Sequence, residues 1–351
     1  MSRETPQAAS SGARQDGRRR RVLSGIQPSG ALHIGNYVGA IRQWVRGQDR
    51  RENFICIVDL HAITVTQEPA TLERRTRELA ALLFACGIDP ARTTLFVQSH
   101  VRAHAEAAWI LGCVTPLGWL ERMTQYKAKA QQQKSVSTGL LTYPVLQTAD
   151  ILLYDADEVP VGEDQKQHIE LARDIALRFN QIYGETFVVP EGVIPEIGAR
   201  VMGFDDPTQK MSKSGEGRDH AVLLTDPDDR IDRILRRAVT DSGRDIVLSD
   251  APEKAGVRNL LTLYQALTER SRAEVEADFA DARGYGELKQ RVAEVVIETV
   301  RPIRQRFEAL YADEAELDRL LAVGAEAARA VAEPKIELVK ERVGFLPARK
   351  T

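Results

Sequence analysis

Two short segments, about 175 residues apart in a chain of 351, contain residues suited to binding a polyphosphate. The later one is Lys210-Met211-Ser212-Lys213-Ser214, in a polar stretch that also contains Gly215 and Gly217. Two ammonium groups three residues apart, with a hydroxyl group between them, can clamp the oxygens of a polyphosphate. The glycines would allow the loop to close over a ligand. For this segment alone, the alternative is a solvated loop.

The earlier segment joins a turn to the start of a helix. Gln27-Pro28-Ser29-Gly30 forms the turn, and His33-Ile34-Gly35-Asn36 opens the helix. The free N–H groups and positive dipole end of a helix N-terminus suit phosphate, and Gly35 lets a flat group such as adenine approach the backbone. The alternative for this segment alone is a turn whose serine or histidine caps the helix.

A third segment has polar side chains along one side of an apolar helix. Residues 140–154 have helical spacing, and Tyr143, Gln147, Asp150 and Tyr154 fall at positions i, i+4, i+7 and i+11. Polar groups within an apolar helix line a pocket or meet buried partners. The pattern predicts a ligand pocket with Asp150 as its acceptor, and a satisfied structural network is the alternative.

The elements that position these residues alternate between strand and helix over the first hundred positions. Residues 22–26, 54–58 and 93–97 are apolar, β-rich runs of the kind found in buried strands. One helix begins near Ile34, and another begins at Pro69, a favourable first-turn position. The apolar stripe of the first helix consists of Ile34, Val38, Ile41 and Val45. This order predicts an α/β fold with a parallel sheet and helices on its faces.

Beyond residue 100 the pattern changes. Residues 103–154 have helical periodicity without strands, which indicates a helical insertion. The elements expected after it are a strand at 159–161, a helix at 163–180, candidate strands at 188–189 and 197–202, and helices beyond 220. The expected parts of the chain are a disordered Arg-rich tail at 1–20, an α/β domain at 21–204, a loop at 205–220, and a helical region at 221–351 whose last helix packs back on the α/β domain.

The composition is that of a globular protein, with 43% apolar and 28% charged residues. The net charge of −3 neither supports nor excludes a nucleic-acid partner, because a local basic face can bind phosphates. There is no run of about 18 apolar residues, and the arginines near the N-terminus precede no apolar core. We therefore expect neither a membrane span nor a secretory signal, and we expect a cytoplasmic protein.

No metal site is predicted. Cys56, Cys86 and Cys113 form no C-x-x-C pair, and we expect all three to be small buried residues. His100 and His104 have the i, i+4 spacing of helical metal ligands, but no cluster of cysteines or carboxylates accompanies them. We expect neither a zinc site nor a disulfide framework.

Residues 210–214 and 33–36 together resemble the KMSKS and HIGH signatures of class I aminoacyl-tRNA synthetases. The first is an unmodified match, whereas Asn36 stands where the HIGH consensus has histidine, a change common in the tryptophanyl branch. The resemblance implies that both segments bind ATP. It also implies that His33 and Asn36 contact the phosphates, and that Lys210 and Lys213 stabilise the leaving pyrophosphate.

Residues 59–64, 150–154 and 161–168 closely resemble bacterial tryptophanyl-tRNA synthetases, and the similarity runs from about residue 22 to the C-terminus. It implies a Rossmann-like sheet, a helical anticodon-binding region at 221–351 and a homodimer. The residues expected to act in catalysis are Lys210, Lys213, Lys129 and Gln27. The residues expected to contact ATP are Gln27, Pro28, Ser29, His33, Gly35, Asn36, Gly162, Glu163, Asp164, Val201, Lys210, Met211, Ser212, Lys213 and Ser214. Mg²⁺ is expected to bind through the phosphate oxygens of ATP.

The same resemblance implies a tryptophan pocket. Its expected lining is Asp150, Tyr143, Gln147, His61, Gln165, Leu23, Val159 and Val161. Tyr143 and Gln165 would hold the substrate amine. An indole ring offers one N–H donor and no acceptor, which suits the acceptor-only carboxylate of Asp150. A buried acceptor left unpaired costs roughly 1–3 kcal/mol, which selects against a ring without that donor.

Two positions depart from this branch. Leu23 stands where phenylalanine is usual near the indole, and Gln147 stands where methionine is usual. Gln147 adds a polar group to the pocket wall. Either change would alter the affinity for tryptophan or admit a substituted indole.

The implied reaction has two steps. The carboxylate of L-tryptophan attacks the α-phosphate of ATP, which gives tryptophanyl-AMP and pyrophosphate, and the adenylate then acylates the terminal ribose of tRNA(Trp). The basic residues expected to help recognise the anticodon are Arg236, Arg237, Arg244 and Lys254. Two alternatives stay open. One is a tyrosine-specific relative, and the other is a synthetase paralogue that binds tryptophan or RNA in a regulatory or accessory role without charging tRNA.

Overall fold

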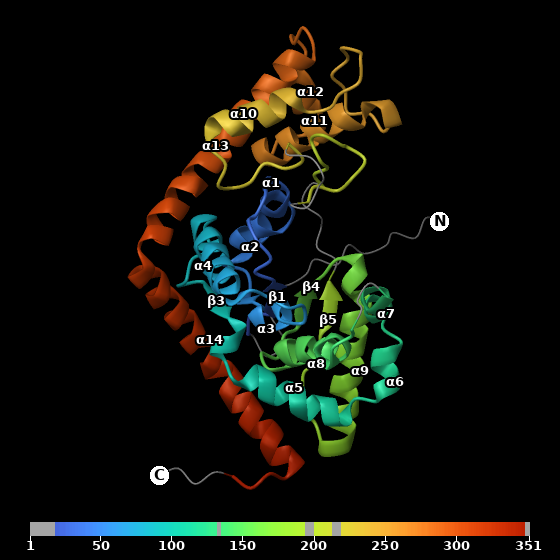
Figure 1. The fold of residues 1–351 in the computed structure, drawn as a ribbon, viewed down its shortest axis with the longest axis vertical. Coiled ribbons are helices and arrows are strands. Elements are labelled where there is room, and N and C mark those ends of the chain that lie inside the picture. The colour runs from blue at the N-terminus through green and yellow to red at the C-terminus, as the bar shows by residue number, and fades with distance from the viewer. Residues whose placement is uncertain (1–17, 132–134, 194–199, 213–218, 348–351) are drawn as a thin grey trace, which may run out of the picture.

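The computed structural model describes residues 18–131, 135–193, 200–212 and 219–347. At its centre lies a sheet of five parallel strands in the order β3-β2-β1-β4-β5 (Figure 1). The strands are β1 (Arg21–Ile26), β2 (Glu52–Ile57), β3 (Thr93–Val97), β4 (Glu158–Pro160) and β5 (Glu191–Val193). The strand order reverses between β1 and β4, so a crevice forms at their carboxyl ends. The predicted α/β fold with a parallel sheet is confirmed.

Helices cover both faces of the sheet. In β2, Ile55 and Ile57 join one core cluster, and Phe54 and Cys56 join the other, because successive side chains of a strand point to opposite faces. The first cluster contains α4 (Pro69–Ala85). The second contains α5 (Ala103–Val114), α8 (Thr138–Leu152) and α9 (Lys166–Tyr183). Between α5 and α8 lie α6 (Leu117–Glu121) and α7 (Thr124–Gln131). The central strand β2 is therefore buried on both sides, as is usual in a parallel sheet.

The helix predicted to begin at Ile34 forms in three consecutive parts. These are α1 (Ile34–Asn36), a π-helical turn η1 (Tyr37–Ile41) and α2 (Arg42–Gly47). Of the predicted apolar stripe, three side chains are buried and the last is half-buried: Ile34, Val38, Ile41 and Val45. The helix that Pro69 was expected to open is α4, and its N-cap is Glu68.

The fifth strand begins at Glu191, two residues after the end of the candidate at 188–189. Pro190 has no N–H to donate to a strand ladder, so pairing cannot begin there. It begins at Glu191, whose N–H donates to the carbonyl oxygen of Asp157 at 2.9 Å. The prediction of a strand at 188–189 is therefore wrong.

Two predicted features fall partly outside the described residues. The candidate strand at 197–202 is described only from residue 200, and Met202 forms no more than an isolated bridge there. Of the predicted tail at 1–20, residues 1–17 are outside the described chain. Arg20 is tied to the sheet, because its Nη1 lies 2.8 Å from Oε1 of Glu158 in β4.

One cysteine differs from the prediction. Cys56 and Cys86 are buried as expected, but Cys113 is exposed. It lies in α5, whose buried face is formed by other positions, including Ile110 and Leu111. The expectation of a buried Cys113 is therefore wrong.

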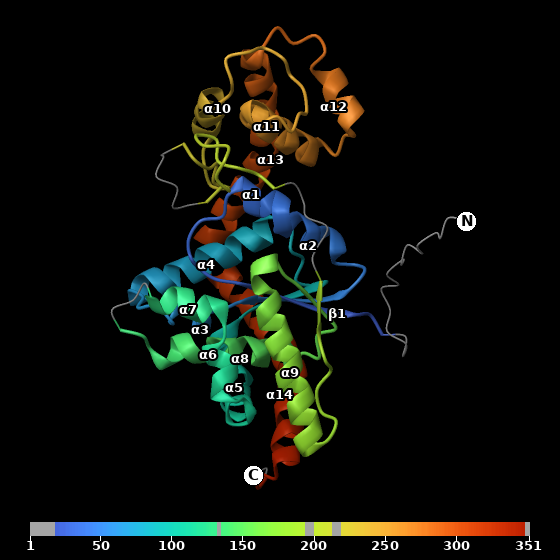
Figure 2. The ribbon, with the colours of Figure 1, turned by 90° about the vertical axis from the view of Figure 1, so that its right-hand side faces the viewer.

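The chain beyond residue 227 is largely helical. The helices are α10 (Asp228–Arg237), α11 (Ala255–Thr268), α12 (Arg272–Asp278), α13 (Tyr285–Ala312) and α14 (Glu314–Val343). The first three gather at one end of the molecule, α13 leads away from them, and α14 runs along the α/β part (Figures 1 and 2). Within the described ranges, no helix is long and apolar enough to cross a membrane.

Helix α14 crosses the edge of the sheet at β3. Leu321 belongs to the core cluster on one face of the sheet, and Ala328 belongs to the cluster on the other face. Between them, a Cβ added at Gly324 would lie 1.8 Å from the carbonyl oxygen of Leu95 in β3. Only glycine permits this approach. The last helix therefore covers an edge strand that would otherwise be open.

Candidate functional site

A cavity of about 330 Å³ opens at the carboxyl ends of β1, β2 and β4. Its size is that of a small-molecule site, and it lies in the crevice where open parallel sheets bind ligands. All eight residues expected in the tryptophan pocket line it: Leu23, His61, Tyr143, Gln147, Asp150, Val159, Val161 and Gln165.

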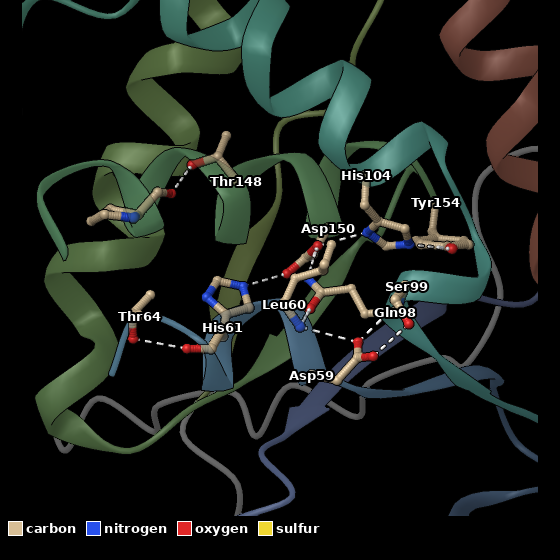
Figure 3. Close-up of polar contacts among 11 residues, drawn as sticks. Asp59, Leu60, His61, Thr64, Gln98, Ser99, His104, Thr148, Asp150 and Tyr154 are labelled. Atoms are coloured by element: carbon tan, nitrogen blue, oxygen red, sulfur yellow. Dashed lines mark hydrogen bonds and ion pairs between the residues drawn. The ribbon is translucent and has the colours of Figure 1, made fainter. Parts of the chain in front are cut away.

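Asp150 is 3% exposed and is surrounded by donors (Figure 3). His61 Nε2 lies 2.8 Å from Oδ2 of Asp150. At the other oxygen, Oδ1, Gln98 Nε2 donates at 2.7 Å and His104 Nδ1 lies at 2.6 Å. An ionised carboxylate has about four lone-pair sites, so the protein uses three and leaves one on Oδ2. Asp150 thus belongs both to a ligand cavity and to a structural network.

These donors keep Asp150 ionised. Burial alone would raise the pKa of Asp150, but hydrogen bonds from His104 and His61 outweigh burial and hold that pKa below its usual value. The other nitrogen of His104, Nε2, lies 2.9 Å from the hydroxyl group of Tyr154. Burial raises the pKa of Tyr154, so this phenol stays protonated and can donate.

Gln98 and His104 are site residues that sequence reasoning missed. Gln98 directly follows β3, and the carboxyl end of that strand faces the same edge of the sheet as the ends of β1 and β2. The position of Gln98 directly after a strand could therefore have identified it as a candidate site residue. His104 is buried and bonded to Asp150, whereas His100 is exposed. The i, i+4 spacing of the two histidines gave no hint of this role.

The two residues expected to hold the substrate amine already have partners. The hydroxyl group of Tyr143 lies 2.9 Å from His168 Nε2, and burial raises the pKa of Tyr143 to about 12. Gln165 Nε2 donates to Oδ2 of Asp164 at 2.9 Å. Gln125 donates to the carbonyl oxygen of Asp164 at 3.1 Å and also lines the cavity. Gln125 and His168 are further residues that sequence reasoning missed.

Of the other residues expected to act on ATP, Gly162 lies in the lining of the cavity, and Glu163 and Lys129 lie in neighbouring elements. Gly162 lines it, and a Cβ added there would lie 2.8 Å from Oδ1 of Asp164. Glu163 begins the 3-10 turn η3 (Glu163–Gln165). Lys129 lies in α7, and the first residue of this helix, Thr124, donates its N–H to the side chain of Gln167 at 2.9 Å.

His33 and Asn36 cap the first helix. The N–H of His33 donates to Oδ1 of Asn36 at 3.0 Å, and the N–H of Asn36 donates to Nδ1 of His33 at 3.3 Å. This reciprocal capping box occupies both side chains. Between them, a Cβ added at Gly35 would lie 3.0 Å from the His33 ring. Asn36, the departure from the HIGH consensus, thus has a local structural role.

The turn at 27–29 lines a second cavity of about 290 Å³. This cavity shares Gln27 and His61 with the first one. Pro28 and Ser29 also line it, and Gly30 closes the turn with a φ of +118° that favours glycine. Two ligand-sized cavities therefore adjoin at Gln27.

The two signatures meet in space. The N–H of Ile34 donates to the carbonyl oxygen of Val222 at 2.9 Å, which joins the first helix to the segment after the 205–220 loop. Met211 is 3% exposed, and its sulfur would lie 3.4 Å from a Cβ added at Gly35. Within the 205–220 loop, Met211 therefore lies directly beside the first signature.

A histidine anchors the base of this loop. His220 is 4% exposed, its Nδ1 lies 2.5 Å from Oδ1 of Asp205, and its Nε2 lies 3.3 Å from the carbonyl oxygen of Lys210. The ring thus connects both ends of the loop. The side chain of Lys210 is exposed.

The remaining residues expected near ATP are Val201, Ser212, Lys213 and Ser214, of which the structure describes the first two. Val201 is buried, and its carbonyl oxygen accepts the N–H of Met211 at 3.3 Å. Ser212 is half-buried. Lys213 and Ser214 lie outside the described residues.

Comparison with known proteins gives a consistent result. The family model described as tRNA synthetases class I (W and Y) matches residues 15–301. The tryptophan–tRNA ligase of Wolinella succinogenes is 50% identical over 329 residues, which cover 93% of this chain and 99% of the relative. The tryptophan–tRNA ligase of Caldanaerobacter subterraneus is 52% identical over 327 residues, which cover 93% of this chain and 99% of that relative.

Solved structures agree with this result. The tryptophanyl-tRNA synthetase of Campylobacter jejuni, crystallised with ADP and tryptophan, is 37% identical and has a TM-score of 0.82; the match covers 93% of this chain and all of that one. A tyrosyl-tRNA synthetase from Aeropyrum pernix, 23% identical with a TM-score of 0.63, shares the fold. The paired signatures, the crevice and these matches lead to one conclusion: the chain belongs to the class I aminoacyl-tRNA synthetases, in the family of the tryptophan and tyrosine enzymes.

Proposed function

We propose that this chain is a tryptophan–tRNA ligase. It activates L-tryptophan with ATP to form tryptophanyl-AMP and pyrophosphate, and then transfers the tryptophanyl group to tRNA(Trp). Relatives about half identical to it carry this name, and a similar structure was solved with ADP and tryptophan. We place the reaction in the cytoplasm, where tRNA is charged.

The observation that carries the choice of amino acid is the lone pair left open on Asp150. Leu23, Val58, Ile151 and Val159 give the same cavity apolar walls. An indole ring buries its carbon surface against such walls and has a single N–H left to pair. One open acceptor on a carboxylate that is otherwise saturated by donors matches that single N–H.

The adjoining cavities suggest how the two substrates meet. With its indole at Asp150, tryptophan would direct its amine to Tyr143 and Gln165. ATP would bind along the turn at 27–29 and the two signatures, so that the tryptophan carboxylate and the α-phosphate come together near Gln27, which both cavities share. No side chain acts as a nucleophile. Catalysis consists of positioning the substrates and stabilising the charge of the pentavalent phosphate.

The positive charge for this step comes from lysines and from the metal that accompanies ATP. Within the described ranges there is no group of three or more His, Cys, Asp or Glu side chains that could hold a metal. We propose that Mg²⁺ would bind through the phosphate oxygens of ATP and would neutralise charge there. Lys129, Lys210 and Lys213 would then stabilise the triphosphate and the leaving pyrophosphate.

Exchange of labelled pyrophosphate into ATP, dependent on the added amino acid, tests the proposed function. We expect exchange with tryptophan, and a kcat/KM at least about 100-fold lower with tyrosine. Exchange driven by tyrosine would overturn the choice of amino acid. Absence of exchange with either amino acid would overturn the catalytic assignment and leave the fold unchanged.

We propose the exposed end of α10 as part of the tRNA-binding surface. The side chains of Arg236 and Arg237 are 57% and 71% exposed at the last turn of that helix. Lys254 is less exposed: its side chain is 15% exposed, and its Nζ lies 2.8 Å from the hydroxyl group of Tyr285 and 3.3 Å from Oδ2 of Asp241. Its charge is used within the helical region itself.

Replacing Arg236 and Arg237 together by glutamate should lower kcat/KM for tRNA about 10-fold or more, because the reversed charges repel phosphates. Tryptophan-dependent pyrophosphate exchange, which needs no tRNA, should stay within about twofold. The matched control is Arg319→Glu on α14, since Arg319 is also exposed and is paired within its own helix. Equal loss of charging and exchange in the double variant would contradict the assignment of this surface.

An exposed apolar surface favours a homodimer. Its large side chains, on α5, α6 and α9, are Trp109 (76% exposed), Leu117 (58%) and Leu177 (53%). Arg178 joins these helices, because its Nε donates to the carbonyl oxygen of Val114 at 2.8 Å and its guanidinium lies 6.0 Å from the centre of the Trp119 ring. Large exposed apolar side chains on neighbouring helices are suited to a protein interface, and we propose these three as part of the dimer contact.

Replacing Trp109 by aspartate should raise the dimer dissociation constant at least about 100-fold, because large aromatic side chains dominate interface energies. Sedimentation equilibrium measures this constant. As a control, Val247→Asp changes an exposed apolar residue outside this surface and should leave the constant unchanged. A Trp109→Asp protein that stays dimeric at the wild-type concentration range would place the interface elsewhere.

A further inference from the structure

A buried histidine and a buried tyrosine lie behind the carboxylate of Asp150. Figure 3 shows His61 on one side of Asp150, and His104 with Tyr154 on the other. His104 and Tyr154 are both 0% exposed. The Tyr154 ring lies 4.8 Å from that of Phe54 and 5.4 Å from that of Phe96, centroid to centroid. The tyrosine is therefore held firmly by the core, and the mechanism above gives neither residue a task.

The hydrogen bonds of this group have defined directions. Nδ1 of His104 faces Asp150, which only accepts, so Nδ1 carries the hydrogen. In a neutral imidazole Nε2 is then an acceptor, and the hydroxyl group of Tyr154, 2.9 Å away, donates to it. The Tyr154 hydroxyl thus selects the tautomer of His104 that donates to Asp150.

The bond from His104 determines which oxygen of Asp150 can accept a hydrogen bond from a ligand. Oδ1 receives Gln98 at 2.7 Å and His104 at 2.6 Å, so both of its lone pairs are used. Oδ2 receives only His61, at 2.8 Å, and keeps one lone pair. Without the His104 donor, Oδ1 would have an open lone pair too, and the carboxylate could turn about its soft terminal torsion. The direction of the acceptor in the cavity would then be lost.

We propose that His104, held in its tautomer by Tyr154, is a positioning residue for tryptophan recognition: it fixes the Asp150 carboxylate so that one lone pair of Oδ2 is presented to the ligand N–H. The inference rests on the proposed function, in which Asp150 accepts the indole N–H. Because His104 lies behind Asp150, its loss should reduce discrimination for the N–H group and spare the phosphate chemistry.

Two substitutions at His104 separate its two bonds. Asparagine carries its amide at the position of Nδ1, so His104→Asn can keep the donor to Asp150 while losing the contact with Tyr154. Glutamine carries its amide near the position of Nε2, so His104→Gln can keep the contact with Tyr154 while losing the donor to Asp150. Tyr154→Phe removes the hydroxyl group and keeps the ring.

The measurement is a ratio of kcat/KM values in pyrophosphate exchange, for tryptophan over 3-benzothienylalanine, in which sulfur replaces the N–H. We expect His104→Gln to lower this ratio about 10- to 100-fold through the KM for tryptophan, and His104→Asn to keep it within about threefold. The ratio for Tyr154→Phe should lie between the ratios for these two variants. A purely structural role would lower both kcat/KM values equally, so an unchanged ratio in His104→Gln would overturn the inference.

A further variant separates this inference from the proposed function. An unchanged ratio in Asp150→Asn would refute the role of Asp150 itself. A lowered ratio in Asp150→Asn with an unchanged ratio in His104→Gln would refute only the role of His104. If His104→Gln does not fold, the ratio is measured in Tyr154→Phe instead. An unchanged ratio in that variant would overturn the inference. The KM for ATP and the unfolding temperature of each variant report on the integrity of the fold.

Discussion

Replacing Asp150 by asparagine should lower kcat/KM for tryptophan at least about 100-fold in pyrophosphate exchange, while the KM for ATP stays within about twofold. The amide has the shape of the carboxylate but adds two N–H donors. Gln98 and His104 both donate toward Oδ1, so the amide oxygen must take that side. The NH₂ group then occupies the place of Oδ2 and meets the indole N–H donor to donor.

A matched control exists on the surface. Asp174→Asn removes one carboxylate from an exposed position of α9 and should leave both constants within about twofold. Thermal unfolding of both variants separates a loss of recognition from a loss of folding. If Asp150→Asn keeps kcat/KM for tryptophan within about threefold of the wild type, Asp150 has no part in recognition and the open lone pair on Oδ2 has another purpose.

Replacing Lys210 by methionine should lower the rate of tryptophanyl-AMP formation about 100-fold and leave the KM for tryptophan within about threefold. Methionine keeps an unbranched side chain of similar reach and removes the charge. Lys210 is exposed at the start of its loop, next to Met211, which lies against Gly35 of the first signature. In the proposed mechanism its charge stabilises the leaving pyrophosphate, where negative charge grows in the transition state.

Single-turnover rapid quench measures this step directly, because it is independent of product release and of tRNA. Lys289→Met on α13 is the control, since it removes the same charge from the helical region. A wild-type rate of adenylate formation in Lys210→Met would exclude Lys210 from catalysis. A raised KM for tryptophan at an unchanged rate would instead assign Lys210 to substrate binding.

Local patterns in the sequence were sufficient to predict most of the sheet. The first three strands are short apolar runs, and the stripe at Ile34, Val38 and Ile41 has one helical period, so each pattern depends only on near neighbours. The fifth strand was misplaced at 188–189, because its position depends on pairing with β4 and on the missing N–H of Pro190. Pairing of this kind is not a local property.

The residues of the site also fall into a group that could be predicted from the sequence and a group that could not. Resemblance to known synthetases brought together Leu23, His61 and Gln165, which no spacing rule connects, and all three line one cavity. The donors behind Asp150 were missed, because Gln98 and His104 are 52 and 46 positions away from it. Their role follows from the packing of β3 and α5 against α8, and it becomes visible only when those elements are placed in space.

The path of α14 also has a consequence for how this protein is made. Strand β3 precedes Gly324 by more than two hundred positions, so the ribosome completes every strand long before it synthesises the helix that crosses the edge of the sheet. If the sheet forms before α14 emerges, the nascent chain exposes β3 as a bare edge, which can pair with other chains. We therefore expect a chain truncated before Gly324 to aggregate rather than to form a shorter enzyme.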